Sequence, residues 1–309
     1  MIKRIFLTLF ILSFSACSFY RQIPTEPISL LFAGDLMMAR DVSWKIDNVH
    51  DGDGNYLFED IQDEIGKSDV FFYNLESPFG ENCRTDRNTS MMFCLEKDKV
   101  DYLPRGLEFT VVSLANNHVY NTLQSGFEIT EDILKENNFL TIGAGTDWDD
   151  VHDGKIIEIN EFKIGFLGYT YSQNIFQDFE AAEIHLEDME RDIKKIKEKV
   201  NFVVISCHFG NEYKNLHNSF QEEIAHGAVD FGADLVIGHH PHVIQDFEDY
   251  KGKRIYYSLG NFVFDQHWSE NTRNGILVQM EIDHDGVSYA EVPIYSGDDY
   301  RVTYPPSDE

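Results

Sequence analysis

The sequence predicts a layered α/β fold, with two sheets packed face to face and helices on the outside. Three observations predict this class. Short apolar runs of strand length recur along the chain, amphipathic helical stretches lie between them, and two pairs of runs have hairpin spacing. Elements of this kind bury their apolar faces by stacking in layers. The chain has ample material for such a core, because 42% of its residues are hydrophobic and 24 are Phe.

Five apolar runs are predicted to be strands buried on both faces, because they lack the alternation of polar residues that marks a half-exposed strand. They are residues 28–33, 70–74, 110–114, 202–206 and 235–237. Strands of this type are usual in parallel sheets that are covered by helices.

Three stretches have the apolar spacing of amphipathic helices. They are residues 126–137, 186–200 and 220–231. In the second, an apolar stripe from Met189 to Val200 lies opposite a polar face on which Glu190 precedes Lys194 by four residues. That order of charges favours an ion pair along a helix.

Two hairpins complete the expected elements. Residues 155–159 and 163–167 flank Asn160-Glu161, and residues 276–282 and 287–294 flank a segment with Asp285-Gly286, a strong turn signal. No repeat, low-complexity tract or linker interrupts residues 28–300. We therefore expect one domain over 28–300, followed by a tail at 301–309.

The charge of the chain excludes one class of partner. Among 309 residues, 25 are Lys or Arg and 54 are Asp or Glu, so the formal net charge is −29. Nucleic-acid binding requires a basic face, and we expect none here. An anionic ligand would have to be met by metal ions or by a local basic patch.

Residues 1–17 resemble a bacterial lipoprotein signal peptide. Lys3 and Arg4 precede a short apolar segment, and Ser15-Ala16 precede Cys17, the expected lipidation site. An ordinary secretory signal is the alternative. Residues 18–27 would form a tether. Either reading places the mature chain outside the cytoplasm, in the cell envelope, and the first anchors it to a membrane by lipid.

The three remaining cysteines have different expected roles. Cys83 and Cys94 lie in one polar segment, and in an oxidising compartment we expect them to form a disulfide; two free thiols are the alternative. Cys207 ends an apolar run and is expected in the core, with metal ligation as the alternative.

Metal-capable residues follow directly after the five strand-length runs. In open α/β sheets, sites lie outside the carboxyl ends of the strands, so these segments are expected to share one rim. The residues are Asp35; Asn74 and Glu76; Asn116, Asn117 and His118; His208 and Glu212; and His239, His240 and His242. Taken singly, each has a structural explanation as a helix cap, a turn residue or a hydrogen-bonded histidine. Together they indicate a metal site.

The residue types suit a divalent ion. Mixed oxygen and imidazole ligands fit Zn, Mn or Fe. His240 and His242 flank Pro241 and would face the same side of an extended segment. Two ions would need a bridging carboxylate, for which Asp35 or Glu76 is suitable.

The same segments resemble the CapA family of bacterial capsule synthesis proteins, which are associated with poly-γ-glutamate. The resemblance spans about 230 residues and rests on motifs in family order. They are Gly34-Asp35-Leu36-Met37, Asn74-Leu75-Glu76, Ala115-Asn116-Asn117-His118, Gly143-Ala144-Gly145, His208-Phe209-Gly210-Asn211-Glu212-Tyr213, Gly238-His239-His240-Pro241-His242-Val243 and Tyr257-Ser258-Leu259-Gly260-Asn261-Phe262.

The family is similar to calcineurin-like metallophosphoesterases, which implies a four-layer α/β/β/α sandwich and a site for one or two divalent ions, whether Mn, Zn, Fe or Mg. The resemblance assigns metal ligation to six residues and a leaving-group role to His118. The six are Asp35, Glu76, Asn116, His208, His240 and His242. The sequence differs from the phosphoesterase pattern at Met37, where His is usual, and at Glu76, where Asp is usual. Asn121 replaces an Asp that is common in the family.

Three functions fit these observations. The chain could be an envelope protein of capsule or poly-γ-glutamate synthesis or export, a metal-dependent hydrolase of a phosphoester or of an acidic polymer, or a binding lipoprotein without catalysis. Its partners would be the membrane, the acidic polymer or the synthesis machinery. Arg84 and Arg87, between Cys83 and Cys94, are expected to bind an acidic substrate; incidental arginines on a surface loop are the alternative.

Overall fold

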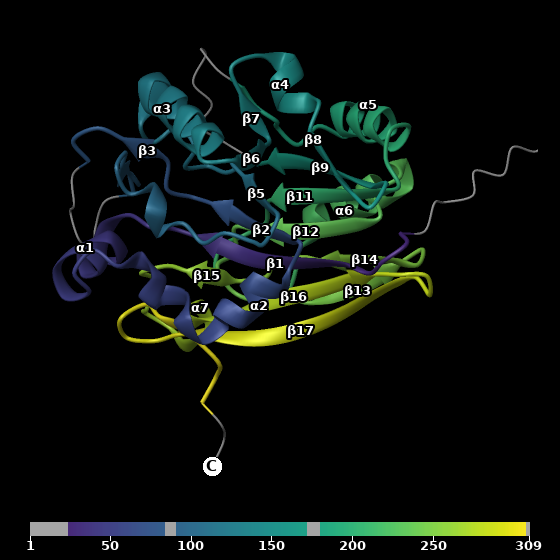
Figure 1. Cartoon of the computed structure of the whole chain (residues 1–309). Coiled ribbons are helices and arrows are strands. Elements are labelled where there is room, and N and C mark those ends of the chain that lie inside the picture. Colours follow the sequence, from purple (N-terminus) through teal and green to yellow (C-terminus); the bar gives the residue numbers. More distant parts are fainter. Residues whose placement is uncertain (1–23, 84–90, 172–179, 307–309) are drawn as a thin grey trace, which may run out of the picture.

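The computed structural model describes residues 24–83, 91–171 and 180–306, and it forms the four-layer α/β/β/α sandwich that the sequence led us to expect (Figure 1). Residues 1–17, which include Cys17, lie outside the described residues, as do 18–23 of the expected tether and Arg84 and Arg87. Within the described ranges, every helix is too short or too polar to cross a bilayer.

The first sheet combines the two ends of the chain. Its order is β18-β17-β16-β1-β2-β5-β6, and β15 pairs with β1 beyond this path. The strands are β1 (Ile28–Leu36), β2 (Val70–Leu75), β5 (Phe109–Ser113), β6 (Phe139–Ile142), β15 (Asn261–Val263), β16 (Asn274–Ile282), β17 (Val287–Ser296) and β18 (Val302–Thr303). From β1 to β6 the strands are parallel, and β16 joins β1 in antiparallel register. In Figure 1, β17 (yellow) lies at one side of this sheet.

The second sheet is built from the middle of the chain, in the order β13-β14-β12-β11-β9-β8. Its strands are β8 (Lys155–Ile159), β9 (Phe162–Thr170), β11 (Phe202–His208), β12 (Leu235–His239), β13 (Phe247–Tyr250) and β14 (Lys253–Tyr256). The inner strands are parallel, whereas β8 and β13 pair antiparallel at the edges. Two small pairs, β3 (Phe79–Gly80) with β4 (Leu95–Glu96) and β7 (Ala144–Gly145) with β10 (Glu180–Ala181), lie outside both sheets.

Helices cover the outer face of each sheet. They are α1 (Arg40–Val49), η1 (Gly54–Ile61), α2 (Gln62–Lys67), η2 (Val100–Tyr102), α3 (Leu123–Glu136), α4 (Trp148–His152), α5 (Leu186–Lys197), α6 (Ser219–Phe231) and α7 (Glu270–Arg273). Alternate residues of one strand face different layers. Phe32 of β1 packs between the sheets, and Leu31 packs under the helices α1, η1, α2 and α3. On the second sheet, Ile205 of β11 packs under α4, α5 and α6.

The predicted elements are present, with shifted ends. β1 and β11 extend the expected runs as far as Leu36 and His208, so that polar site residues belong to the strands themselves. Lys194 pairs with Glu190 along α5, as the spacing predicted. The folded domain reaches beyond the boundary expected at residue 300, because Val302 is fully buried and β18 pairs with β17.

Candidate metal centre

The carboxyl ends of β1, β2, β5, β11 and β12 meet at one rim, where the two sheets come into contact. Asn74 at the end of β2 reaches across to β11, with its Nδ2 atom 3.2 Å from Nδ1 of His208. Asp35 in β1 reaches β12, with Oδ1 3.3 Å from Nδ1 of His239. Buried side chains from both sheets therefore line one site.

The backbone around the site is tightly constrained. A Cβ atom on Gly34 would lie 1.9 Å from the carbonyl oxygen of Gly260, so only glycine permits β1 to run this close to the segment before β15. His240 and His242 have positive φ angles of 97° and 57°. Non-glycine residues held in this region are strained and cluster at functional sites. The constraint aims both imidazoles at the rim.

One group of possible ligands consists of Asp35, Glu76 and His208, whose ligand atoms all lie within 4.8 Å of one another. Nδ2 of Asn74 stands among them, 2.8 Å from Oδ1 of Asp35, 3.2 Å from Oε1 of Glu76 and 3.2 Å from the His208 nitrogen. A carboxamide nitrogen has two hydrogens. Asn74 therefore cannot satisfy all three acceptors at once.

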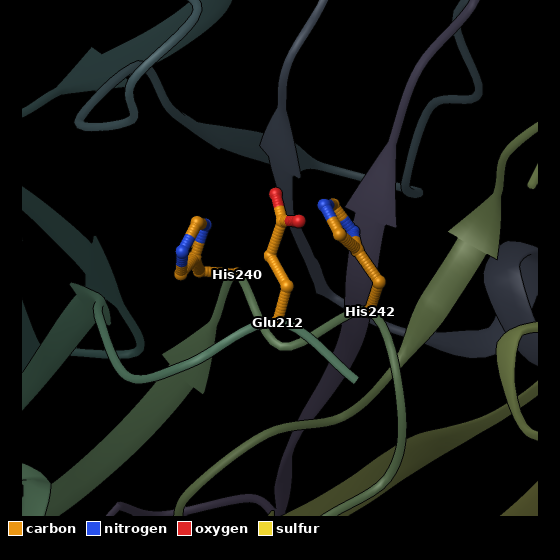
Figure 2. Close-up of side chains that lie close together, drawn as sticks. All are labelled: Glu212, His240 and His242. Carbon is orange, nitrogen blue, oxygen red and sulfur yellow. The ribbon is translucent and has the colours of Figure 1, made fainter. Parts of the chain in front are cut away.

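A second group consists of Glu212, His240 and His242, again within 4.8 Å of one another. Figure 2 shows the carboxylate of Glu212 between the two imidazole rings. The groups adjoin, because the His208 and His240 ring centres are 4.7 Å apart and Nδ1 of His242 lies 3.3 Å from Oδ2 of Asp35. Nδ1 of His242 also lies 3.0 Å from Oδ1 of Asn261.

Burial and mutual contact shift the pKa values at this site. Burial acts to raise the pKa of Asp35, but the His239 and His242 imidazoles hold it well below its ordinary value. Burial raises the pKa of Glu76 well above its ordinary value, and the nearby Asp35 carboxylate adds to this. Burial lowers the pKa of His208 well below its ordinary value and that of His240 to about 4. Both imidazoles are therefore neutral near pH 7, the form that binds metals.

His242 differs from the other two imidazoles. Burial acts to lower its pKa, but the carboxylates of Glu76 and Asp35 outweigh burial and raise it to about 9. Positive charge is therefore favoured at this end of the site, because the buried carboxylates surround it.

His118 lies beside the first ligand group, with Nε2 3.9 Å from Oε2 of Glu76. Its Nδ1 atom lies 2.9 Å from Oδ1 of Asn121, and Nδ2 of Asn117 lies 3.3 Å from its Nε2. Burial lowers the pKa of His118 to about 4. The His118 imidazole is therefore uncharged at neutral pH.

Asn116 hydrogen-bonds to neighbouring residues of the site through both of its side-chain polar atoms. Its Nδ2 atom donates to Oδ1 of Asn74 at 3.1 Å and to the Leu75 carbonyl at 2.8 Å, and its Oδ1 accepts from the His118 backbone at 3.0 Å. These bonds position Asn74 and His118. The other five residues expected as ligands, Asp35, Glu76, His208, His240 and His242, fall in the two groups.

The family resemblance did not assign Glu212 or Asn74 as ligands, although the strand-end pattern included both among the metal-capable residues. Asn74 is two residues before Glu76, so strand geometry turns both side chains to one face. Nearby, Cys83 and Cys94 form a disulfide, and Cys207 is fully buried in the core.

The residues present fit a divalent cation. Oε2 of Glu76 and Nδ1 of His240 are buried without a hydrogen-bond partner among the described residues. Buried polar atoms without partners are rare in proteins, and an ion is one of the few explanations for them. Both atoms belong to residues of the two ligand groups, whose carboxylates and imidazoles are the donors that such ions prefer.

Comparisons of the sequence with known proteins find relatives that match most of the chain. A family model described as "Bacterial capsule synthesis protein PGA_cap" matches residues 29–266. The chain is 31% identical over 287 residues to "Capsule biosynthesis protein CapA" of Bacillus anthracis, a match that covers 86% of this chain and 67% of that protein. It is 32% identical to "PGA biosynthesis protein CapA" of Bacillus subtilis (strain 168), with 86% and 71% covered.

Among solved structures, one similar chain is a "Putative 5'-Nucleotidase" from Staphylococcus aureus. It superposes with a TM-score of 0.53 at 14% identity, over 92% of this chain and 55% of that chain. A likeness at this level of identity concerns the fold alone. It agrees with a sandwich of the metallophosphoesterase type.

Proposed function

Because this chain belongs to the family of bacterial capsule synthesis proteins, we propose that it is an envelope protein of capsule or poly-γ-glutamate biosynthesis or export that uses a divalent metal. The observation that carries the metal proposal is the pair of adjoining ligand groups at the rim of the two sheets. They bring together carboxylates and imidazoles from four separate segments of the chain.

Two sets of residues would hold the metal. One set is Asp35, Glu76 and His208, and the other is Glu212, His240 and His242. Together they could hold one ion or two. Such ligands accept Mn, Zn, Fe or Mg. When bound, a divalent ion would act as a Lewis acid on a carbonyl or phosphoryl oxygen of the substrate.

A second candidate function is hydrolysis of a phosphoester or of an amide bond in an acidic polymer. The position of His118 favours it, because Nε2 faces the ligand groups while Nδ1 is held by Asn121. An imidazole held in this way can take up a proton and deliver it to a leaving group. Met37, which stands where phosphoesterases carry a histidine, is fully buried and lines the core.

The remaining proposals concern placement and partners. Cys17 would be lipidated and would anchor the domain, residues 28–303, to the outer face of a membrane through the short tether. Arg84 and Arg87 would contact carboxylates of the polymer. They belong to the segment that the Cys83–Cys94 disulfide closes, and the base of that segment follows β3.

Metal content and polymer binding of the purified chain test the proposal. After dialysis, elemental analysis should find about one or two divalent ions per chain. Fluorescence anisotropy with labelled poly-γ-glutamate at low salt should show saturable binding. Changing Glu76→Ala together with His208→Ala should remove the metal.

A phosphatase assay and a measurement of polymer length separate the two candidate functions. Shortening of the polymer or release of phosphate by the wild-type chain, lost in the Glu76→Ala, His208→Ala variant, supports hydrolysis. Binding without turnover supports synthesis or export. A chain that carries no metal and does not bind the polymer contradicts the proposal as a whole.

A further inference from the structure

Two exposed aromatic side chains lie at the edge of the candidate centre. Tyr213 directly follows Glu212, and its ring centre is 6.2 Å from that of His242. The Trp268 ring meets the Tyr213 ring edge to face, with centres 5.7 Å apart. Tyr213 is 40% exposed and Trp268 is 62% exposed. Apolar side chains that gather on the surface beside a polar site can mark a place where a ligand binds.

Hydrogen bonds fix the backbone on which this aromatic pair stands. The Tyr213 backbone N–H donates to the Pro241 carbonyl at 2.8 Å, which ties it to the loop of His240 and His242. The Tyr213 hydroxyl accepts from Nε2 of Gln266 at 3.4 Å. Ser269 caps α7 directly after Trp268, by accepting the Thr272 N–H at 3.3 Å. The Tyr213 ring is therefore held in place before a ligand binds, which lowers the cost of ordering it on binding.

Side-chain amides border the same pair. Nδ2 of the exposed Asn271 donates to Oδ1 of the exposed Asn215 at 3.2 Å, which joins the loop after Tyr213 to α7 after Trp268. Each of these amides keeps donor and acceptor capacity toward solvent, because a carboxamide has two hydrogens and two lone pairs. Rings bordered by amides suit a ligand that has one apolar face and several hydroxyl groups.

From this combination we infer that Tyr213 and Trp268 form a binding site for a saccharide chain. The face of an aromatic ring carries partial negative charge, and the C–H groups on one face of a pyranose carry partial positive charge, so the two stack. The hydroxyls at the ring edge would bond to Asn215 and Asn271. A neutral glycan also avoids the repulsion that a polyanion meets from a chain of net charge −29.

The inference extends beyond the proposed function and does not depend on it, because none of the stacking or amide groups belongs to the ligand sets. Glycan binding measured with the metal chelated therefore tests this site alone. If the metal proposal fails, the glycan site can still be correct. If glycan binding is absent, the metal proposal can still be correct.

Isothermal titration of the full chain with chitohexaose and with cellohexaose, in the presence of a chelator, tests the site. At least one of the two should bind saturably. Trp268→Ala should weaken binding by about tenfold or more, since it removes one stacked ring. Trp268→Phe, which keeps a ring, should lose less. Trp148→Ala is the matched control: Trp148 is 46% exposed but lies on α4, stacked against His152, and its loss should leave the affinity unchanged.

Three results would overturn the inference. The first is the absence of heat with either glycan. The second is equal affinity of the wild type and Trp268→Ala. The third is preference for poly-γ-glutamate with a salt-sensitive affinity that Lys214→Ala abolishes, because Lys214 is the exposed cation next to Tyr213 and such binding would be electrostatic. Far-UV circular dichroism of each variant confirms that its fold is intact.

Discussion

The side-chain oxygen of Asn121 lies 2.9 Å from Nδ1 of His118. The same oxygen accepts the backbone N–H of Phe93 at 2.7 Å. An amide oxygen only accepts, so the imidazole proton is assigned to Nδ1, and Nε2 faces Glu76 with its lone pair. The Phe93 ring also stacks on His118, with centres 4.0 Å apart. The disulfide-closed segment, which ends at Cys94, therefore orients the imidazole.

His118→Ala should leave the metal content nearly intact while lowering any hydrolytic turnover about 100-fold, because His118 would transfer a proton without holding the ion. Elemental analysis and steady-state kinetics on the same preparation make the comparison. Asn121→Ala should lower turnover less, since it frees the ring without removing it.

A parallel loss of metal and turnover in His118→Ala would make His118 a ligand. If the wild-type chain turns over neither phosphoesters nor polymer, the hydrolase candidate is rejected. That result supports a role in binding without catalysis.

Removing two imidazoles of the second ligand group should remove most of the stabilisation by metal. An ion that binds only the folded chain raises the melting temperature by mass action. The wild type should therefore melt at a higher temperature with Mn²⁺ or Zn²⁺ than with chelator, and His240→Ala with His242→Ala should show a much smaller difference. His185→Ala is the control, because His185 is exposed and precedes α5. A melting temperature that does not respond to chelation in the wild type speaks against the metal site.

The disulfide should stabilise the domain by about 2–3 kcal/mol, since it closes a short loop in the unfolded chain. The two cysteines are 11 residues apart. The urea midpoint of the wild type should therefore fall on reduction, and Cys83→Ser with Cys94→Ser should match the reduced protein with or without reductant. Identical midpoints for oxidised and reduced wild type would show that the bond contributes nothing to stability.

Ionisation of the Glu131 carboxyl group should lower the free energy of unfolding at alkaline pH. Burial on α3, with Asp150 nearby, raises its pKa from 4.5 to about 7. A raised carboxyl pKa means that the folded state disfavours the ionised form. The stabilisation that Glu131 gives is therefore complete below its ordinary pKa and is lost as the pH rises through about 7.

Glu131→Gln should consequently raise the free energy of unfolding at pH 8 by about 1 kcal/mol, after allowance for solvent screening, and should have little effect near pH 5. Thermal melts at both pH values measure the difference. Glu136→Gln, at the exposed end of the same helix, is the control. An equal shift at pH 5 and pH 8 would exclude ionisation as the cause.

Local pattern was enough to predict most strands and helices. The apolar runs of β2 and β11 are buried on both faces, as the absence of polar alternation indicated. The spacing of polar residues after these runs also predicted which strand ends would share a rim. Parallel strands bring their carboxyl ends to one edge, so little more than strand direction was required.

The pattern included Glu212 among the metal-capable residues, but the direction of its side chain could not be predicted in this way. It lies in a loop, where no periodicity fixes the direction of a side chain. It faces His240 and His242 because the next residue, Tyr213, bonds through its backbone to Pro241 and adopts a positive φ of 62°. A backbone hydrogen bond between two loops cannot be predicted from the residue spacing of either loop. The pairing of β16 with β1 was hidden for a similar reason, because register between distant segments is set by tertiary packing.

That pairing has a consequence for how the chain acquires its structure. β1 carries Asp35 near the start of the chain, whereas its neighbour β16 begins only at Asn274. Contacts between such distant segments form slowly. During synthesis, the edge of β1 from Ile28 to Phe32 stays open until nearly all of the chain has emerged. A chain cut before Asn274 would keep that edge unpaired and available to a strand of another molecule. Asp35 itself pairs with Asn261 of β15, so the rim around Asp35 waits for β15, while the other end of β1 waits for β16.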